Sequence, residues 1–354
     1  MTYLRDHRNR RHVLVGMILG IGLFGCSPPP RQGAGPGPTV IVAEPKEAAA
    51  QSEKLTFSLK FEPGTKTRYR VTTEAVTAME GPETEVRDNA STAHFPKVSE
   101  SSEVVFTQEI LAPVPEDTST VAALVTIEQV RYVRTSPGQP DLTFDSQEPM
   151  DQNSPFARLI GHTYTIEINP LGYVPGVFNL RPARLAVRGP TPAHAAALDL
   201  VSPSAIFPRH GSFSLPGPDV GSLSVGGRWR GVQQLTLKAP GTDMDRLGTH
   251  RFEKIYRLES VEQRPVGAVA VVVFVGSPTP RMTPDGRLAE VPFLSCSYVG
   301  GGEFNLDAGR VEVYLEQLEV RMPLPGTASP SAEGHEGRIV IATRFCRVQR
   351  LDLD

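Results

Sequence analysis

The chain has 354 residues and a formal net charge of −3 at pH 7, and 39% of its residues are hydrophobic. A chain of this length and composition can bury a core. Because it is mildly acidic and has no dense basic stripe, it is a poor candidate for nucleic-acid binding. Its 32 glycines and 33 prolines indicate many turns and short elements.

A basic segment followed by an apolar run opens the chain. Four arginines precede Val13–Phe24, and Gly25 and Cys26 follow directly. The run is shorter than the roughly 20 residues of a membrane-spanning helix, and this order is typical of a secretory signal. Leu23, Gly25 and Cys26 also have the spacing of a bacterial lipobox. We therefore expect a lipoprotein signal peptide at 1–25 and a lipidated Cys26, with an uncleaved anchor helix as the alternative.

Lipidation of Cys26 would place the protein in the bacterial cell envelope. Long acyl chains such as palmitate anchor a protein firmly when more than one is attached. Ser27 is not the aspartate that commonly retains lipoproteins at the inner membrane. The outer membrane is therefore favoured if the cell has one, with the domain facing the periplasm or the surface. The arginine pair at 10–11 leaves the general secretory and twin-arginine export routes both open.

The segment after the lipidated cysteine has the composition of a tether. Proline and glycine dominate its first half, and alanine is frequent in its second half. Such a segment contains little apolar surface to offset the entropy of ordering. We expect a disordered linker at 26–54 and a β-rich extracytoplasmic domain at 55–354.

The pattern of residues changes to alternation at Leu55. Apolar residues occupy every second position from Leu55 to Phe61, and Pro63-Gly64 ends the run, which is typical of a half-buried strand. Further strands are predicted at 67–73, 103–111, 121–134, 162–168, 231–238, 250–261, 266–275, 291–299, 302–306, 311–321 and 338–350.

One helix is predicted among these strands. Thr191 is a suitable N-cap and Pro192 a suitable first helical residue, so we expect a helix over 193–200. The sequence therefore predicts an all-β fold of mainly antiparallel sheets with at most one or two short helices. Features recur in the same order in 55–180 and 223–350, which indicates two similar β units forming a sandwich or an open barrel.

Two aromatic residues lie between pairs of arginines. Tyr69 lies between Arg68 and Arg70, and Trp229 lies between Arg228 and Arg230. On a strand, each aromatic ring would lie on the opposite face from its arginines. The favoured interpretation is an aromatic core with a charged outer face; a cationic surface for an anionic glycan or lipid headgroup is the alternative.

Motifs that carry chemistry are scarce in this sequence. It contains no phosphate-binding loop and no Gly-x-Ser-x-Gly nucleophile motif. His335-Glu336 lacks the second histidine of a zinc protease, and Asp243 and Asp245 lack the glycine and the distant glutamate of a calcium loop. We expect no catalytic residues, no metal site and no cofactor, and we do not expect an enzyme.

Two cysteines remain after Cys26. Cys296 and Cys346 both lie in segments with strand character. An even pair in an oxidising compartment favours a disulfide, for which the two strands would have to be neighbours. Two buried free thiols are the alternative.

Short segments resemble a known family. Phe61–Tyr69, Val225–Trp229 and Tyr256–Val261 are similar to motifs of a family of uncharacterised bacterial lipoproteins with a domain of unknown function. The resemblance covers about 55–350. It implies an extracytoplasmic β-rich domain and brings no catalytic residues with it.

Three functions are consistent with these features. The favoured one is a membrane-anchored β-domain that binds an envelope protein, a glycan or a lipid, or that is a structural component of the envelope. The second is a carrier of a lipid or another apolar ligand, held by a curved sheet with a hydrophobic pocket. The third is a hydrolase whose site is assembled from residues far apart in the sequence.

The lipidation hypothesis predicts the behaviour of one variant. Cys26→Ala should move the protein from the membrane fraction to the soluble fraction, because it removes the attachment point of the acyl chains. Cys296→Ala is the matched control and should leave fractionation unchanged. If Cys26→Ala still requires detergent for extraction, the hypothesis is wrong.

Overall fold

The computed structural model describes residues 54–80, 97–111, 120–211, 213–217, 220–237, 248–280, 293–323 and 339–353. The expected signal peptide, Cys26 and the body of the expected linker lie outside this part of the chain, as do Asp243, Asp245, His335 and Glu336. The domain boundary near residue 54 therefore stays a prediction.

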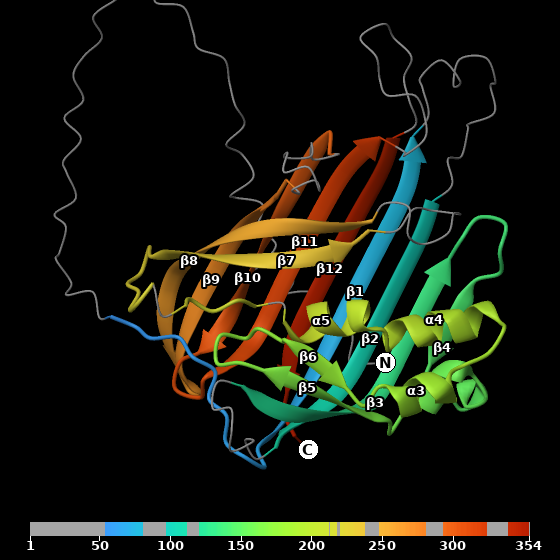
Figure 1. The fold of residues 1–354 in the computed structure, drawn as a ribbon, viewed down its shortest axis with the longest axis horizontal. Helices are drawn as coiled ribbons and strands as arrows, with labels where there is room; N and C mark the ends of the chain where they lie inside the picture. Colours follow the sequence, from blue (N-terminus) through green and yellow to red (C-terminus); the bar gives the residue numbers. More distant parts are fainter. Residues whose placement is uncertain are drawn as a thin grey trace, which may run out of the picture. The chain divides into compact units, whose positions relative to one another are not determined.

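The described strands form one open antiparallel sheet of twelve strands (Figure 1). Their spatial order is β6-β5-β3-β2-β1-β12-β11-β10-β9-β8-β7, and β4 pairs with β3 beside this path. The strands are β1 Lys66–Glu80, β2 Lys97–Ile110, β3 Val121–Thr135, β4 Leu142–Asp145, β5 Thr163–Ile168, β6 Gly176–Phe178, β7 Arg228–Thr236, β8 Thr249–Arg264, β9 Gly267–Pro278, β10 Ser295–Asn305, β11 Arg310–Pro323 and β12 Ile339–Leu351.

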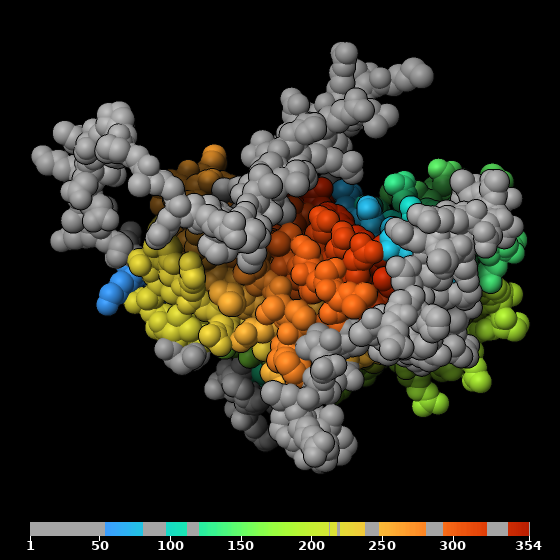
Figure 2. Space-filling model, turned by 90° about the horizontal axis from the view of Figure 1, so that it is seen from above, coloured from blue at the N-terminus to red at the C-terminus, as the bar shows by residue number. Residues whose placement is uncertain are grey.

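The prediction of an all-β, antiparallel fold is confirmed, and the two expected halves share one sheet. The half at 55–180 forms β1 to β6 and the half at 223–350 forms β7 to β12. Pairing between β1 and β12 joins them, so the halves do not form two separate sheets. Figure 2 shows the red atoms of the last strands beside the blue atoms of β1. Whether the halves arose by duplication stays a prediction.

Alternation in the sequence explains the two faces of the sheet. In β11, Tyr314, Leu318 and Val320 are buried, whereas Gln317 and Glu319 between them are exposed. In β7, Trp229 is only 3% exposed and its two flanking arginines are exposed. The interpretation of an aromatic core beneath a charged outer face is confirmed for this strand.

The described residues include three α-helices, whereas at most two are predicted from the sequence. They are α3 Arg181–Ala186, α4 Pro192–Leu200 and α5 Pro203–His210, and two short 3-10 helices, η1 Pro149–Asp151 and η2 Pro155–Leu159, precede them. The prediction of α4 is confirmed, and the Thr191 side chain caps it by accepting a hydrogen bond from the His194 backbone nitrogen. α3 and α5 were missed because both are short and α5 contains Pro208, which resembles a loop signal.

The helices cover one face of the sheet, which we call the inner face. Figure 1 shows α3, α4 and α5 together with β5 and β6 in front of the central strands. α5 packs against β6 and β7, which are the two edge strands. No helix in the described residues is long and apolar enough to cross a membrane.

Residues 55–62, which we call the strap, are extended but do not form the expected strand. The backbone of the strap bonds three separate parts of the fold: Leu55 pairs with Leu223, the Leu59 nitrogen donates to the Pro170 carbonyl (2.8 Å), and the Lys60 nitrogen donates to the Gly309 carbonyl (2.9 Å). Apolar residues alternate along the strap as in a strand, and one of them, Phe57, points into the core, where it contacts Trp229 and Phe304.

Gly309 allows the strap to approach the turn between β10 and β11. Its φ is +59°, and a Cβ atom there would lie 2.7 Å from the Lys60 backbone nitrogen. Gly309→Ala should therefore lower the free energy of unfolding through backbone strain and through loss of the Lys60 hydrogen bond, by about 2 kcal/mol or more.

Gly138→Ala separates these two effects. Gly138 has a similar φ of +72° with no atom within 4 Å of an added Cβ, so its substitution should cost only the strain, about 1 kcal/mol. Urea unfolding measures both costs. Equal losses in the two variants would contradict the role assigned to the strap contact.

Candidate functional site

The structure contradicts the expected disulfide between Cys296 and Cys346. Both cysteines are free, and they lie on β10 and β12, each of which pairs with β11. Cys296 is opposite Val320 and Cys346 is opposite Glu316, so one whole strand and four residues separate them. Strand spacing places the α-carbons roughly 16 Å apart, far beyond the reach of a disulfide. The strand predicted at 311–321 forms β11, which lies between the two cysteine-bearing strands.

A cavity of about 280 Å³ lies on the inner face of the sheet. Its floor comes from β1, β2, β11 and β12, and its cover comes from the strap, the end of α5 and residues 213–215. The apolar side chains that line it include Phe61, Phe106, Ile110, Ile168, Phe213 and Val348. Ligand pockets in proteins are of about this size or larger and are mostly apolar with a few polar groups.

Aromatic contacts hold the walls of this cavity in place. Phe106 lies 4.7 Å from the His210 ring and 5.8 Å from the Tyr69 ring, measured between centroids. Phe213 meets Tyr314 edge-on at 5.9 Å. Each ring therefore packs against a neighbour from another element, which fixes the shape of the cavity before any ligand binds.

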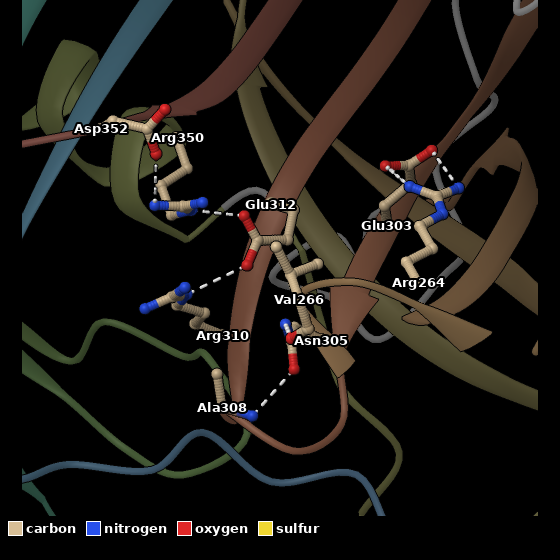
Figure 3. Close-up of polar contacts among 9 residues, drawn as sticks. All are labelled: Arg264, Val266, Glu303, Asn305, Ala308, Arg310, Glu312, Arg350 and Asp352. Carbon is tan, nitrogen blue, oxygen red and sulfur yellow. Dashed lines mark hydrogen bonds and ion pairs between the residues drawn. The ribbon is translucent and has the colours of Figure 1, made fainter. Parts of the chain in front are cut away.

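A polar turn forms one rim of the cavity (Figure 3). The buried Asn305 side chain donates to the Val266 carbonyl and accepts from the Ala308 nitrogen, both at 2.8 Å. These bonds fix the turn that presents Ala308, Gly309 and Arg310 to the cavity. The rim is therefore held by the Asn305 side chain as well as by the strap.

Several polar groups that line the cavity have no protein partner. Within the described residues, no hydrogen bond involves the side chains of Thr67, Tyr69 or Gln108, which share the inner face of β1 and β2. Burial raises the pKa of Tyr69 to about 12, and the charge of Glu312 acts in the same direction. The Tyr69 hydroxyl therefore stays protonated and can donate a hydrogen bond to a ligand.

His210, at the end of α5, lines the cavity on the side of its cover. Its side chain is neutral. Burial, and then the charge of Arg209, lower its pKa well below the ordinary value. Its Nε2 atom lies 2.8 Å from the Tyr164 hydroxyl. This bond orients the imidazole, whose ring lies in tilted contact with Phe106.

A buried ion pair lies behind the cavity wall. Lys254 and Glu316 are each 1% exposed, and Lys254 Nζ lies 2.9 Å from Glu316 Oε2 and 2.6 Å from the Tyr314 hydroxyl. Arg344 also pairs with Glu316. The Tyr314 hydroxyl donates a hydrogen bond to the Glu316 carboxylate at 2.7 Å. The Tyr298 hydroxyl lies 2.7 Å from both Glu316 and Gln233 and donates its single proton to one of them.

Two cations and several donors keep Glu316 ionised. Burial alone would raise the pKa of its carboxyl, but the charges of Lys254 and Arg344 and the bonds from Tyr298 and Lys254 outweigh burial and lower it to about 2. Burial lowers the pKa of the Lys254 ammonium, against the attraction of Glu316. The ammonium lies over the rings of Phe274 and Tyr298, at 4.5 and 4.9 Å from their centroids, which adds a cation–π contribution.

Two glycines make room for this cluster on the inner face. An added Cβ at Gly276 would lie 2.6 Å from the Tyr298 ring, and one at Gly300 would meet the Phe274 ring. Without side chains at these positions, the two rings can lie against the backbone of β9 and β10. Lys254 on β8 can then reach Glu316 on β11 across the two intervening strands.

The two parts of the site differ in what they can do chemically. Of the ion-pair cluster, only Tyr314 lines the cavity, so Lys254 and Glu316 are closed off from a ligand. Within the part of the chain that the structure describes, no group of three or more His, Cys, Asp or Glu residues could hold a metal ion. The cavity can therefore bind a molecule, whereas the cluster holds the wall.

This cluster was not predicted, although the sequence contains a signal for it. Lys254 alternates with Phe252 and Tyr256 along β8, and Glu316 alternates with Tyr314 and Leu318 along β11. A charged residue at an inward position of an alternating strand indicates a buried partner. The identity of that partner depends on the fold, because these two residues come from strands that are not neighbours.

Comparisons with known proteins find only distant structural matches. No protein-family model and no curated protein matches the chain. A structure of lipid–protein interactions in lipovitellin aligns over 83% of this chain at 11% identity with a TM-score of 0.44, and the chain spans about a quarter (26%) of that protein's length. The transport unit of the autotransporter AIDA-I from Escherichia coli aligns over 81% of this chain and 90% of its own at 6% identity, with a TM-score of 0.20. Both scores are too low to support an argument about function.

The buried ion pair predicts a large difference between two lysine substitutions. Lys254→Met should lower the free energy of unfolding by about 3–5 kcal/mol, because it breaks a buried pair. Lys66→Met is the matched control: Lys66 is 3.3 Å from Glu109 but about half exposed, so the loss should stay below about 1 kcal/mol. Guanidinium unfolding measures both, and similar small losses would show that the buried pair does not stabilise the fold.

Proposed function

We propose that the domain binds an apolar or amphipathic small molecule in the cavity beneath the strap, and that the protein carries or presents this ligand. The observation that carries the proposal is the cavity of about 280 Å³ between the curled sheet and its cover. The second of the three functions considered from the sequence is thereby favoured over the first.

The size of the cavity argues against a simple packing defect. Protein interiors contain few voids larger than one water molecule, which takes up about 30 Å³ in the liquid. The walls are mostly apolar, and three polar side chains among them lack a partner within the described residues. A ligand with an apolar body and a polar end would satisfy both kinds of surface.

The proposed location rests on the N-terminal sequence. A lipid anchor on Cys26 and a tether over 26–54 would hold the domain close to a bilayer in the bacterial envelope. A membrane is a source of apolar ligands, so the location suits a carrier. The resemblance to bacterial lipoproteins of unknown function is compatible with this role.

The hydrolase considered from the sequence gains less support. The cluster of titratable groups around the buried Lys254 and Glu316 is closed off by aromatic rings. A substrate in the cavity would meet Tyr314 but neither charged group. We therefore propose binding rather than catalysis.

Filling the cavity should weaken binding. Val348 lies on the floor of the cavity, so Val348→Phe should reduce the affinity for the neutral apolar dye Nile red by about tenfold or more, since the ring occupies the ligand's volume. Val232→Phe on β7 is the matched control: Val232 is 48% exposed and lies outside the cavity, so affinity should be unchanged.

Fluorescence titration of the purified full chain measures both affinities, and circular dichroism checks that each variant is folded. Saturable binding by the unmodified protein and by Val232→Phe, with loss in Val348→Phe, is the expected result. Failure of the unmodified protein to bind, or equal binding by all three proteins, would overturn the proposed function.

A further inference from the structure

The cavity has one charged wall, formed where β11 begins and β12 ends. Arg310, which lines the cavity, donates through Nε to Glu312 at 3.0 Å. Arg350 binds the other oxygen of the same carboxylate and also lies 3.3 Å from Asp352 (Figure 3). Glu312 thus lies between two arginines.

Positive charge is in excess at this wall. Two guanidinium groups share the carboxylate of Glu312, whose side chain is 12% exposed, while Asp352 is 93% exposed and screened by water. Among the described residues, Glu312 is the only hydrogen-bond or ion-pair partner of the Arg310 side chain. The terminal nitrogens of this guanidinium therefore have donors to offer a ligand.

The other charged groups that line the cavity are already engaged or face water. Lys60 Nζ donates to the Asp307 carbonyl, and the Asp307 carboxylate accepts from the Ala268 nitrogen. The Arg209 guanidinium donates to the Leu200 carbonyl at the end of α4. Glu62 is exposed. Arg310 is the lining cation whose charge acts on the Tyr69 hydroxyl, so these two groups can meet the same ligand.

The neutral Tyr69 hydroxyl, a hydrogen-bond donor, lies near the charged groups of this wall. The Tyr69 hydroxyl is close enough to Arg310, Glu312 and Arg350 for all three charges to act on it, and its side chain lines the same cavity. Thr67, two residues earlier on the same face of β1, and its partner Gln108 on β2 add further hydrogen-bonding groups.

We propose that the ligand is a single-chain anionic amphiphile, a fatty acid in chemical class, whose carboxylate binds Arg310 and the Tyr69 hydroxyl while its chain lies among the apolar walls. The proposal rests on the proposed function and names its ligand. A planar guanidinium with two free terminal nitrogens matches the two oxygens of a carboxylate. The volume of about 280 Å³ is at the low end for a ligand site and suits one chain better than a two-chain lipid.

The test compares decanoate with 1-decanol, which has the same chain and no charge. Each ligand displaces Nile red from the purified full chain in a competition titration. The unmodified protein should bind decanoate about tenfold more tightly than decanol, since hydrogen bonds to a charged group are the stronger ones. Arg310→Gln should remove this preference by weakening decanoate alone, and Arg310→Lys should retain part of it.

Arg230→Gln is the matched control. Arg230 lies on β7, is 75% exposed in its side chain and lies outside the cavity, so the preference for decanoate should persist. If decanoate and decanol bind equally to the unmodified protein, or if Arg310→Gln weakens both alike, the anionic ligand is ruled out while the proposed function stands. If neither ligand displaces the dye and the dye itself does not bind, the proposed function fails as well.

Discussion

Thirteen residue pairs, from Arg68–Leu351 to Glu80–Ile339, join the first long strand of the domain to the last. Without this pairing β1 and β12 would each be an exposed edge, and the chain would form two separate sheets. With it, one sheet curls until its true edges, β6 and β7, both contact α5. The cavity lies on the strands that this pairing brings together, with Tyr69 from β1 and Val348 from β12 in its lining.

A sheet that curls this strongly must fill a crowded inner face. The structure does so with aromatic rings that pack where glycines leave room, at Gly276 and Gly300. The same curvature brings Lys254 within reach of Glu316 although β9 and β10 separate their strands. A charge pair at this depth is stable only because each partner is also hydrogen-bonded or packed on an aromatic face. This ion pair favours one curvature of the sheet, because a flatter sheet would separate the two charges while leaving both of them buried.

The sequence was informative about strands because alternation is a local property. β3, β9 and β11 were predicted nearly to their ends, and the Thr191-Pro192 signal predicted α4.

The order of strands in the sheet is not a local property, and the errors of prediction follow from that. Cys296 and Cys346 were expected on neighbouring strands, but β11 inserts between them. The strap alternates like a strand, yet its hydrogen-bond partners are three loops from distant parts of the chain. The cavity could not be predicted at all, because its lining comes from β1, β2, β11, β12, α5 and the strap together.

Tyr314 connects the two parts of the inner face. Its ring lines the cavity and contacts Phe213, while its hydroxyl lies between Lys254 and Glu316. Moving this ring would leave a buried ammonium and a buried carboxylate each short of a hydrogen bond, which is costly for buried charged groups. The ion pair therefore holds one wall of the cavity rigid from behind, and the wall needs no ordering when a ligand arrives. A binding site gains affinity when its walls are already ordered in the folded protein, because binding then costs less conformational entropy. The buried charges thus contribute to the proposed binding function without touching the ligand.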